Sequence, residues 1–417
     1  MRMRRSGLGQ KGSRLLAFVA LALACGLLAA SLADANNRLK GRFYFQADDG
    51  RRGCELWRTD GTRRGTKLFK QIVPGPNGGW PGAFQRFRKR LFFSAETQGR
   101  GAELWVTTGK RKRTRLLKDI NPGPDNSRPS YLTPLGKRRL LFVASRPDRG
   151  EELWVTNGTR KGTRLFKDIV PGPGSSNPYG LVRLGRRVFF TARAEGSGYE
   201  LWVTNGTRKG TRLFKEIVPG PDGSSPTSLA AAGGRLYFAA RDENDDLEPW
   251  VSNGKPGGTR LLRDIAPGSL ASSAPTDFAR LGKWVYFSAN DNSAGFELWR
   301  TDGTTAGTKL FLELSPGPGD GFPQGITRFR KRLFFAAMSG TTWGVWSTNG
   351  TTKGIRRLLD SSGITAQDFT PLGRWLYFRA NDPQHGTELW RTDGTRKRTR
   401  LLKDIAPGPS GSQCLSI

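Results

Sequence analysis

The chain has 417 residues, with 68 lysines and arginines against 35 aspartates and glutamates, which gives a formal net charge of +33 at pH 7. Its single histidine excludes any site that needs several imidazole groups. The 55 glycines, 25 prolines, 24 phenylalanines and 12 tryptophans favour short aromatic strands and tight turns over long helices. We therefore expect an all-β protein whose charge either meets an anionic partner or is a solvated surface.

The first 35 residues are typical of an export signal. Basic residues between Arg2 and Arg14 precede an apolar run from Leu15 to Ala33, and small residues follow. We expect cleavage near Ala35; the alternative is an uncleaved N-terminal anchor, because the run approaches the roughly 20 residues that cross a bilayer. In either case, residues 36–417 are predicted to form a single domain outside the cytoplasm, secreted or in the cell envelope.

A repeated unit organises the rest of the chain. Eight tryptophans recur at spacings of 44 to 49 residues: Trp57, Trp105, Trp154, Trp202, Trp250, Trp299, Trp346 and Trp390. Around each of them lie four short apolar segments separated by turn residues, for example near 181–184 and at 188–190, 200–204 and 213–217. Four antiparallel strands per unit of this length predict an eight-bladed β-propeller.

The two ends of the chain predict how the ring closes. The first copy begins with its second segment, at 42–45, whereas the last copy is followed by a tail, 407–417, that aligns with the start of a first segment. We expect this C-terminal segment to supply the inner strand of blade one. The same register places Cys54 and Cys414 in one blade, which predicts a disulfide in an oxidising compartment; the alternative is two free thiols.

The repeat motif resembles that of a known family. Residues 55–62, 297–304 and 388–395 each match the pattern ELWxxDGT in full. Over residues 39–409 the chain resembles the bacterial ELWxxDGT-repeat proteins, which implies an exported, propeller-like protein and no particular activity. Other copies depart from the pattern, with Asn157, Asn205 and Asn349 in place of Asp, so an Asp-dependent ion site in every blade is not expected.

Basic residues gather in two kinds of turn, those between the first and second and between the third and fourth segments of each copy. These turns fall on one face of a propeller, which we expect to be strongly basic, while acidic residues such as Asp148 and Asp242 make the other face acidic. The candidate binding residues on the basic face are Arg88, Lys89, Arg90, Lys110, Arg111, Lys112, Arg138, Arg139, Arg330, Lys331, Arg396 and Lys397.

Residues with catalytic or metal-binding chemistry are few. His385 lies in a loop and is expected to be solvated, and the glutamate that recurs before each Leu-Trp pair is expected to serve the blade. A ligand would instead meet residues that break the repeat. Asp242, Asp245 and Asp246 form a candidate Ca²⁺ site, with a solvated acidic loop as the alternative. Trp80 and Trp343 also break the pattern, either to stack on a ligand or to pack between blades.

The sequence therefore predicts an exported scaffold that is not an enzyme and needs no cofactor. Its basic face would bind anionic cell-envelope or extracellular polymers or another protein, but not nucleic acid, and the attraction would weaken with salt. We expect a monomer without a membrane span beyond an N-terminal anchor. The alternatives are a purely structural surface protein and a secreted polysaccharide hydrolase or lyase.

Overall fold

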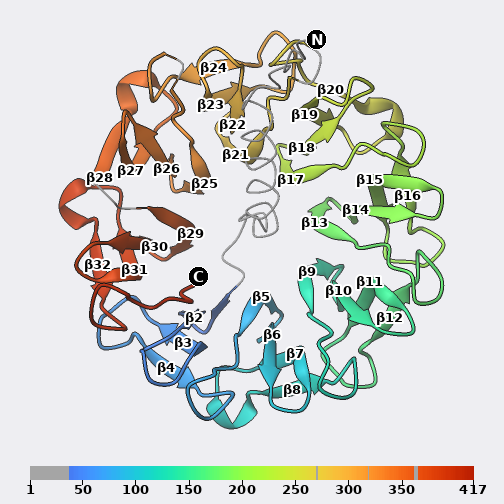
Figure 1. Cartoon of the computed structure of the whole chain (residues 1–417), viewed down its shortest axis with the longest axis vertical. Coiled ribbons are helices and arrows are strands. Elements are labelled where there is room, and N and C mark those ends of the chain that lie inside the picture. Colours follow the sequence, from blue (N-terminus) through green and yellow to red (C-terminus); the bar gives the residue numbers. More distant parts are fainter. Residues whose placement is uncertain (1–36, 269–270, 318, 361–364) are drawn as a thin grey trace, which may run out of the picture. The chain divides into compact units, whose positions relative to one another are not determined.

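The fold was analysed in a computed structural model that describes residues 37–268, 271–317, 319–360 and 365–417. These residues belong to one compact unit, Ser31–Ile417, in which eight four-stranded antiparallel sheets form a ring (Figure 1). The predicted eight-bladed β-propeller is confirmed. The predicted export segment, 1–35, lies outside the described residues. Within the described ranges, no helix is long and apolar enough to cross a membrane.

Each blade contributes four strands, which we call A to D from the centre of the ring outward (Figure 1). Blades one to four consist of β1 (Arg38–Leu39), β2 (Arg42–Ala47), β3 (Glu55–Thr59), β4 (Lys67–Lys70), β5 (Gly82–Phe87), β6 (Arg90–Thr97), β7 (Gly101–Thr107), β8 (Arg115–Lys118), β9 (Ser130–Leu135), β10 (Arg139–Arg146), β11 (Gly150–Thr156), β12 (Arg164–Lys167), β13 (Tyr179–Leu184), β14 (Arg187–Ala194), β15 (Ser197–Thr204) and β16 (Arg212–Lys215).

Blades five to eight repeat this arrangement. They consist of β17 (Thr227–Ala232), β18 (Arg235–Arg241), β19 (Leu247–Ser252), β20 (Thr259–Leu261), β21 (Thr276–Leu281), β22 (Trp284–Asn290), β23 (Phe296–Thr301), β24 (Lys309–Leu312), β25 (Gln324–Phe329), β26 (Arg332–Ser339), β27 (Thr342–Thr348), β28 (Arg356–Asp360), β29 (Ala366–Leu372), β30 (Trp375–Asp382), β31 (Gly386–Thr392) and β32 (Arg400–Lys403). Short 3-10 helices lie between strands C and D of four blades: η1 (Arg111–Arg113), η2 (Pro256–Gly258), η3 (Thr352–Gly354) and η4 (Arg396–Arg398).

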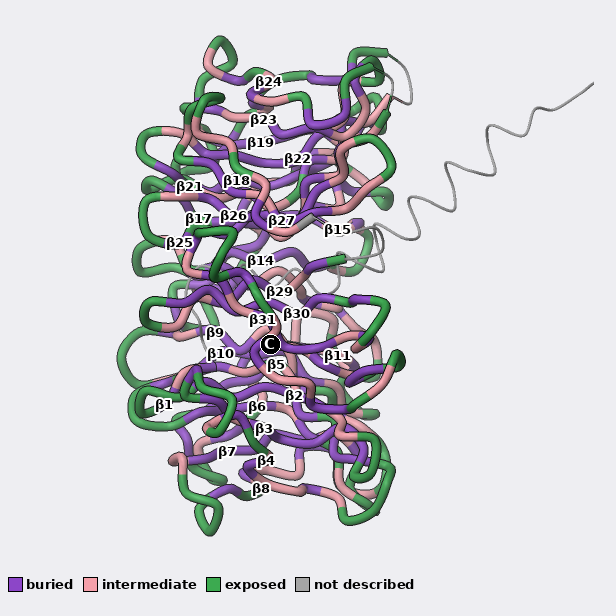
Figure 2. The backbone as a smooth tube through the Cα atoms, turned by 90° about the vertical axis from the view of Figure 1, so that its left-hand side faces the viewer, coloured by how far each residue is buried: buried purple, intermediate pink, exposed green. Residues whose placement is uncertain are grey.

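The hydrophobic cores lie between neighbouring blades. One cluster joins Leu141 and Leu153 of blade three to Phe190 and Trp202 of blade four. Because each sheet packs against a neighbour on both sides, strand B is buried along consecutive residues and does not alternate between apolar and polar positions. Figure 2 shows the buried strands in the middle of the ring and exposed turns along both of its faces.

The inner strand of blade one is assembled from both ends of the described chain. Ser416 pairs antiparallel with Gln46 of β2, with backbone N–O distances of 3.0 and 3.2 Å, while Arg38 of β1 pairs with Phe43. The C-terminal segment was predicted to supply this strand; the structure shows that it supplies the first part and that β1 supplies the second. Two residues are too short a segment to give a strand pattern, which is why β1 was missed.

The C-terminal segment is also held by a buried side chain and a disulfide. Its Leu415 side chain is fully buried in the cluster that contains Trp57 of blade one and Tyr377 of blade eight. Cys54 and Cys414 form the predicted disulfide, and their Cα atoms are 6.0 Å apart. Because the bond links residues 360 positions apart, it joins the two ends of the ring covalently.

An arginine clamp connects several blades. The arginine at the start of strand B donates a hydrogen bond to a glycine carbonyl in the C–D turn of the next blade, over 2.8 to 3.1 Å: Arg90 to Gly158, Arg139 to Gly206, Arg187 to Gly254 and Arg235 to Gly303. These bonds show that the A–B and C–D turns share one face, as predicted. We call it the turn face, and the opposite one, with the B–C loops and D–A connections, the loop face.

We expect Arg139→Ala to lower the free energy of unfolding by about 2 kcal/mol, because the substitution removes a charged donor from the half-buried Gly206 carbonyl. The measurement is chemical denaturation. Arg138→Ala is the matched control, since Arg138 is exposed in the adjacent position of the same turn, and it should change stability by less than about 0.5 kcal/mol. Equal losses in the two variants would contradict the clamp.

Candidate functional site

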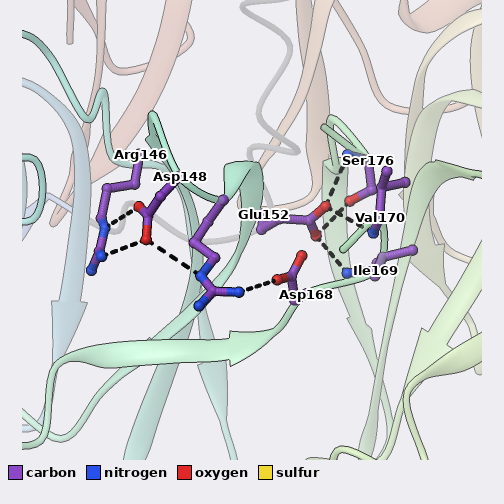
Figure 3. Close-up of polar contacts among 8 residues, drawn as sticks. Arg146, Asp148, Glu152, Asp168, Ile169, Val170 and Ser176 are labelled. Carbon is purple, nitrogen blue, oxygen red and sulfur yellow. Dashed lines mark hydrogen bonds and ion pairs between the residues drawn. The ribbon is translucent and has the colours of Figure 1, made fainter. Parts of the chain in front are cut away.

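The recurring glutamate fastens seven of the eight blades internally. In blade three the buried Glu152 carboxylate accepts hydrogen bonds from the backbone N–H groups of Ile169, Val170 and Ser176, at 3.0, 3.1 and 2.9 Å, and from the Ser176 hydroxyl at 2.7 Å (Figure 3). The carboxylate thereby ties the D–A connection to strand C. The interpretation that this group serves the blade agrees with these contacts.

Three of these glutamates have strongly raised pKa values. Burial raises the pKa of Glu248, Glu297 and Glu388 to about 7 from an ordinary 4.5, although backbone donors favour the charged form. The neighbouring carboxylates Asp264, Glu313 and Asp404 raise these pKa values further.

We predict that the protein loses stability as the pH rises from about 4.5 to 7. Over this range Glu248 loses its proton in the unfolded chain but keeps it in the folded protein. The free energy of unfolding therefore falls, by roughly 3 kcal/mol for a pKa shift of this size. Denaturation at pH 5, 6, 7 and 8 tests this. In Glu248→Gln the decrease should be smaller than in the control Glu243→Gln, an exposed residue of the same blade; identical pH profiles would disprove the assignment.

The twelve candidate binding residues lie on the turn face. All but Arg139 are exposed, and Arg139 is half-buried. Arg90 and Arg139 belong to the arginine clamp, and Arg111 donates to the Leu68 carbonyl of the preceding blade at 3.1 Å. Several of the predicted binding side chains thus hold blades together, which the sequence alone did not reveal.

The loop face carries paired charges. Asp148 lies 2.5 Å from Arg146, and Arg149 lies 3.3 Å from Asp168 (Figure 3). The prediction of a simply acidic face was therefore incomplete, because arginines of the same loops accompany the carboxylates.

The predicted Ca²⁺ candidates have other partners in the structure. The Asp242 carboxylate accepts from the backbone of Asn244 at 2.8 Å and so caps a turn, while Asp245 pairs with Arg241 at 3.2 Å and Asp246 is buried. Across the described ranges, no group of three or more His, Cys, Asp or Glu residues is placed to hold a metal ion.

His385 is paired with a carboxylate. Its Nδ1 atom lies 3.0 Å from both carboxylate oxygens of Asp382, whose side chain is 6% exposed, whereas that of His385 is 39% exposed. The prediction of a solvated loop histidine therefore missed an oriented imidazole. A buried carboxylate at Nδ1 fixes the orientation of the ring, as a general base requires.

The inner wall of the ring contains a cluster that breaks the repeat. Tyr131 of β9 occupies the β-bulge of its strand with φ 51°, where blades two and five have Ala83 and Ser228 with the same backbone conformation. Tyr179 begins the inner strand of the next blade, and its ring centroid lies 5.7 Å from that of Tyr199. At the Tyr131 position, blade two and blades four to eight have only alanine, glycine, serine or aspartate.

Charged groups complete this cluster. Burial raises the pKa of Glu151, and the guanidinium of Arg128 acts against that rise. Burial, and then the negative charge of Glu151, raise the pKa of Tyr131. We call Arg128, Tyr131, Glu151, Tyr179 and Tyr199 the tyrosine cluster. It was not predicted; the signal that could have found it is tyrosine at a repeat position that is otherwise occupied by small residues.

Trp80 is the exposed large apolar side chain of the described residues, with 53% of its surface accessible. It lies on the loop face at the end of the D–A connection, with φ 46°, and its indole nitrogen donates to the Asn77 carbonyl at 3.0 Å. Arg128 holds the same position one blade further on, also with positive φ. Trp343, by contrast, packs against the core between blades seven and eight.

The fold is shared with the propellers of peptidases. Oligopeptidase B from Leishmania major aligns with 79% of this chain at 10% identity and a TM-score of 0.52, a prolyl endopeptidase with 94% at 14% and 0.49, and puromycin hydrolase with 81% at 15% and 0.48. The alignments cover 49%, 54% and 54% of those proteins, so this chain spans about half of their length. No protein-family model and no curated protein matches the chain.

This comparison corrects two expectations. The sequence led us to predict a non-catalytic scaffold for anionic polymers and a protein that is not an enzyme, and both predictions are contradicted by the likeness to oligopeptidase B. The error arose because the high positive charge was interpreted as a ligand signal, whereas part of it lies in the arginine clamp between blades.

Proposed function

We propose that this chain is a peptidase-related propeller that binds peptides at the tyrosine cluster. The observation that carries the proposal is the convergence of three half-buried tyrosines, one carboxyl and one guanidinium from blades three and four, with Tyr131 and Tyr179 on the inner strands. The fold likeness to oligopeptidase B supports it.

The cluster offers what an extended peptide needs. Strands β9 and β13 are innermost in their sheets, so one backbone edge of each has no strand partner in its own blade. Such an edge presents hydrogen-bond donors and acceptors to an added chain. Beside it, tyrosine rings provide apolar contact area with a polar end, and Glu151 and Arg128 provide charges of both signs.

For hydrolysis, the described residues contribute the Asp382–His385 pair on the loop face. Its geometry fits a base that accepts a proton at Nε2 while Asp382 orients Nδ1. In the proposal this pair acts as the general base that takes a proton from the water attacking a peptide bond.

The test uses the full chain and a library of labelled peptides, with binding measured by fluorescence anisotropy and cleavage by mass spectrometry. Tyr131→Ala, which reproduces the residue that blade two has naturally, should weaken peptide binding about tenfold, equivalent to about 1.4 kcal/mol. Ser228→Ala at the same position of blade five is the matched control and should bind normally. His385→Ala should abolish cleavage and spare binding. Absence of binding and cleavage across the library would refute the proposal.

We also propose that the protein works outside the cytoplasm and belongs with the ELWxxDGT-repeat proteins. The Cys54–Cys414 disulfide supports the location, because such bonds persist in oxidising compartments. Cell fractionation with an antibody against the chain tests the location.

A further inference from the structure

The junction of blades six and seven differs from the four junctions before it. In four successive junctions, from blade two to blade six, a guanidinium from strand B fills the space above the C–D turn of the next blade. Between blades six and seven, Trp284 occupies that strand position, and the Gly350 carbonyl receives the Tyr286 hydroxyl at 3.3 Å instead. The space that the arginine fills elsewhere is open here, in a depression of ≈ 380 Å³.

The lining of this depression is cationic and aromatic. Lys283, Arg328 and Lys331 are exposed at its edge, and no carboxylate is among the lining residues. The half-buried Trp284 ring lies under Lys283, 5.1 Å from ring centroid to Nζ, and Arg300 lies 4.4 Å from the same centroid. Nearby, the pKa of Asp302 in the same blade is lowered, first by the hydrogen bond from the Thr304 hydroxyl and to a smaller extent by the charge of Lys283.

The junction of blades eight and one also has a tryptophan at this strand position, but its polar contacts differ. Between blades eight and one, Trp375 replaces the arginine, but Arg391 from strand C reaches the Gly61 carbonyl at 2.5 Å and restores the clamp. The turn residue beside it is Asp60, whereas the turn in blade seven has Asn349. At the junction of blades six and seven, therefore, the glycine carbonyl accepts from a tyrosine hydroxyl and the turn has an asparagine in place of the carboxylate, while the guanidinium of Arg300 lies against the Trp284 ring.

We propose that this depression is a binding site for a small organic carboxylate whose carboxyl group is attached to an apolar group. Arg328 offers a planar pair of donors that matches a carboxylate, and Lys331 and Lys283 add positive charge. The Trp284 ring receives the apolar group. Such a ligand occurs as the C-terminal residue of a peptide and as an N-acylated amino acid. The site lies on the turn face, so it is separate from the tyrosine cluster.

The experiment measures binding to the full chain by titration calorimetry, with N-acetyl-leucine, an acetylated tripeptide ending in leucine, and the C-terminal amide of that tripeptide. The two free carboxylates should bind at least about tenfold more tightly than the amide. A stronger affinity for the tripeptide than for N-acetyl-leucine assigns the site to peptide ends; equal affinities assign it to the single residue. Equal binding of acid and amide overturns the proposal.

Two variants locate the binding. Trp284→Arg supplies the side chain that other blades have here, so it should close the depression and lower the affinity about tenfold or more, with stability kept at the wild-type level in denaturation. Lys331→Ala should weaken binding, whereas Lys89→Ala, which removes the same lysine from the A–B turn of blade two, should not. Unchanged binding in Trp284→Arg, or equal losses in the two lysine variants, overturns the site. Because Tyr131 is untouched in these variants, a loss of binding in them can be distinguished from a loss in Tyr131→Ala.

Discussion

Removal of the Cys54–Cys414 disulfide should lower the free energy of unfolding by about 4 kcal/mol. The bond closes a loop with 360 residues of sequence separation, and a cross-link over such a length strongly restricts the unfolded chain. The location of the disulfide increases this loss of stability, because the bond anchors the C-terminal segment. That segment contributes Leu415 to the core between blades eight and one and Ser416 to the inner strand of blade one.

The measurement is urea denaturation of the wild type, Cys54→Ser, Cys414→Ser and the double variant under oxidising conditions, with bond formation checked on a non-reducing gel. Either single variant should lose as much as the double variant, since each breaks the same bond. In all three, the C-terminal segment should become sensitive to limited proteolysis. Wild-type stability in the variants would show that Leu415 and its hydrogen-bonded neighbours close the ring without the covalent link.

The architecture could be predicted because every blade repeats the same pattern of strands and turns. Tryptophan spacing, turn glycines and aromatic runs recur in eight copies, so an error in one copy is corrected by the others. The pairing of Cys54 with Cys414 followed from the same register, because the tail was recognised as the start of an inner strand.

Contacts between blades could not be predicted in the same way. The arginine clamp joins Arg139 to Gly206, 67 residues away, and which carbonyl the guanidinium reaches depends on how adjacent sheets are rotated. The sequence does contain one indication of the clamp. In two blades a tryptophan, Trp284 or Trp375, replaces the strand B arginine. Strand C of the same blades has arginine in place of valine, at Arg300 and Arg391.

The tyrosine cluster was missed for a related reason. Tyr131 and Tyr179 are 48 residues apart and occupy different positions of the repeat, so their meeting depends on the bulge that gives Tyr131 a positive φ. The alternation of apolar and polar residues along a strand does not reveal where such a bulge occurs. The expectation that a ligand meets residues that break the repeat did point toward this kind of position.

Loss of a recurring glutamate should also have a large effect. We expect Glu200→Ala to destabilise the protein by about 3 to 4 kcal/mol, because the fully buried carboxylate accepts from Ile217, Val218 and Ser224 backbone groups, each at 3.0 Å, and from the Ser224 hydroxyl at 2.7 Å. Alanine would leave these donors buried without acceptors, at about 1 to 3 kcal/mol for each unsatisfied group, less whatever water can enter.

The matched control for this substitution is Glu216→Ala, an exposed glutamate beside β16 of the same blade, which should change stability by less than about 0.5 kcal/mol. Glu200→Gln should fall between the two, because its carbonyl oxygen accepts from some of the donors while its amide group opposes the others. Blade seven shows how the fold tolerates the loss: Gly344 stands at this position, and the Arg357 side chain occupies the space and donates to Thr342 and Trp343. Blade four has Leu213 where blade seven has Arg357. A small effect of Glu200→Ala would therefore mean that water replaces the carboxylate, and amide hydrogen exchange at Ile217 and Val218 would then be as fast in the variant as in an exposed loop.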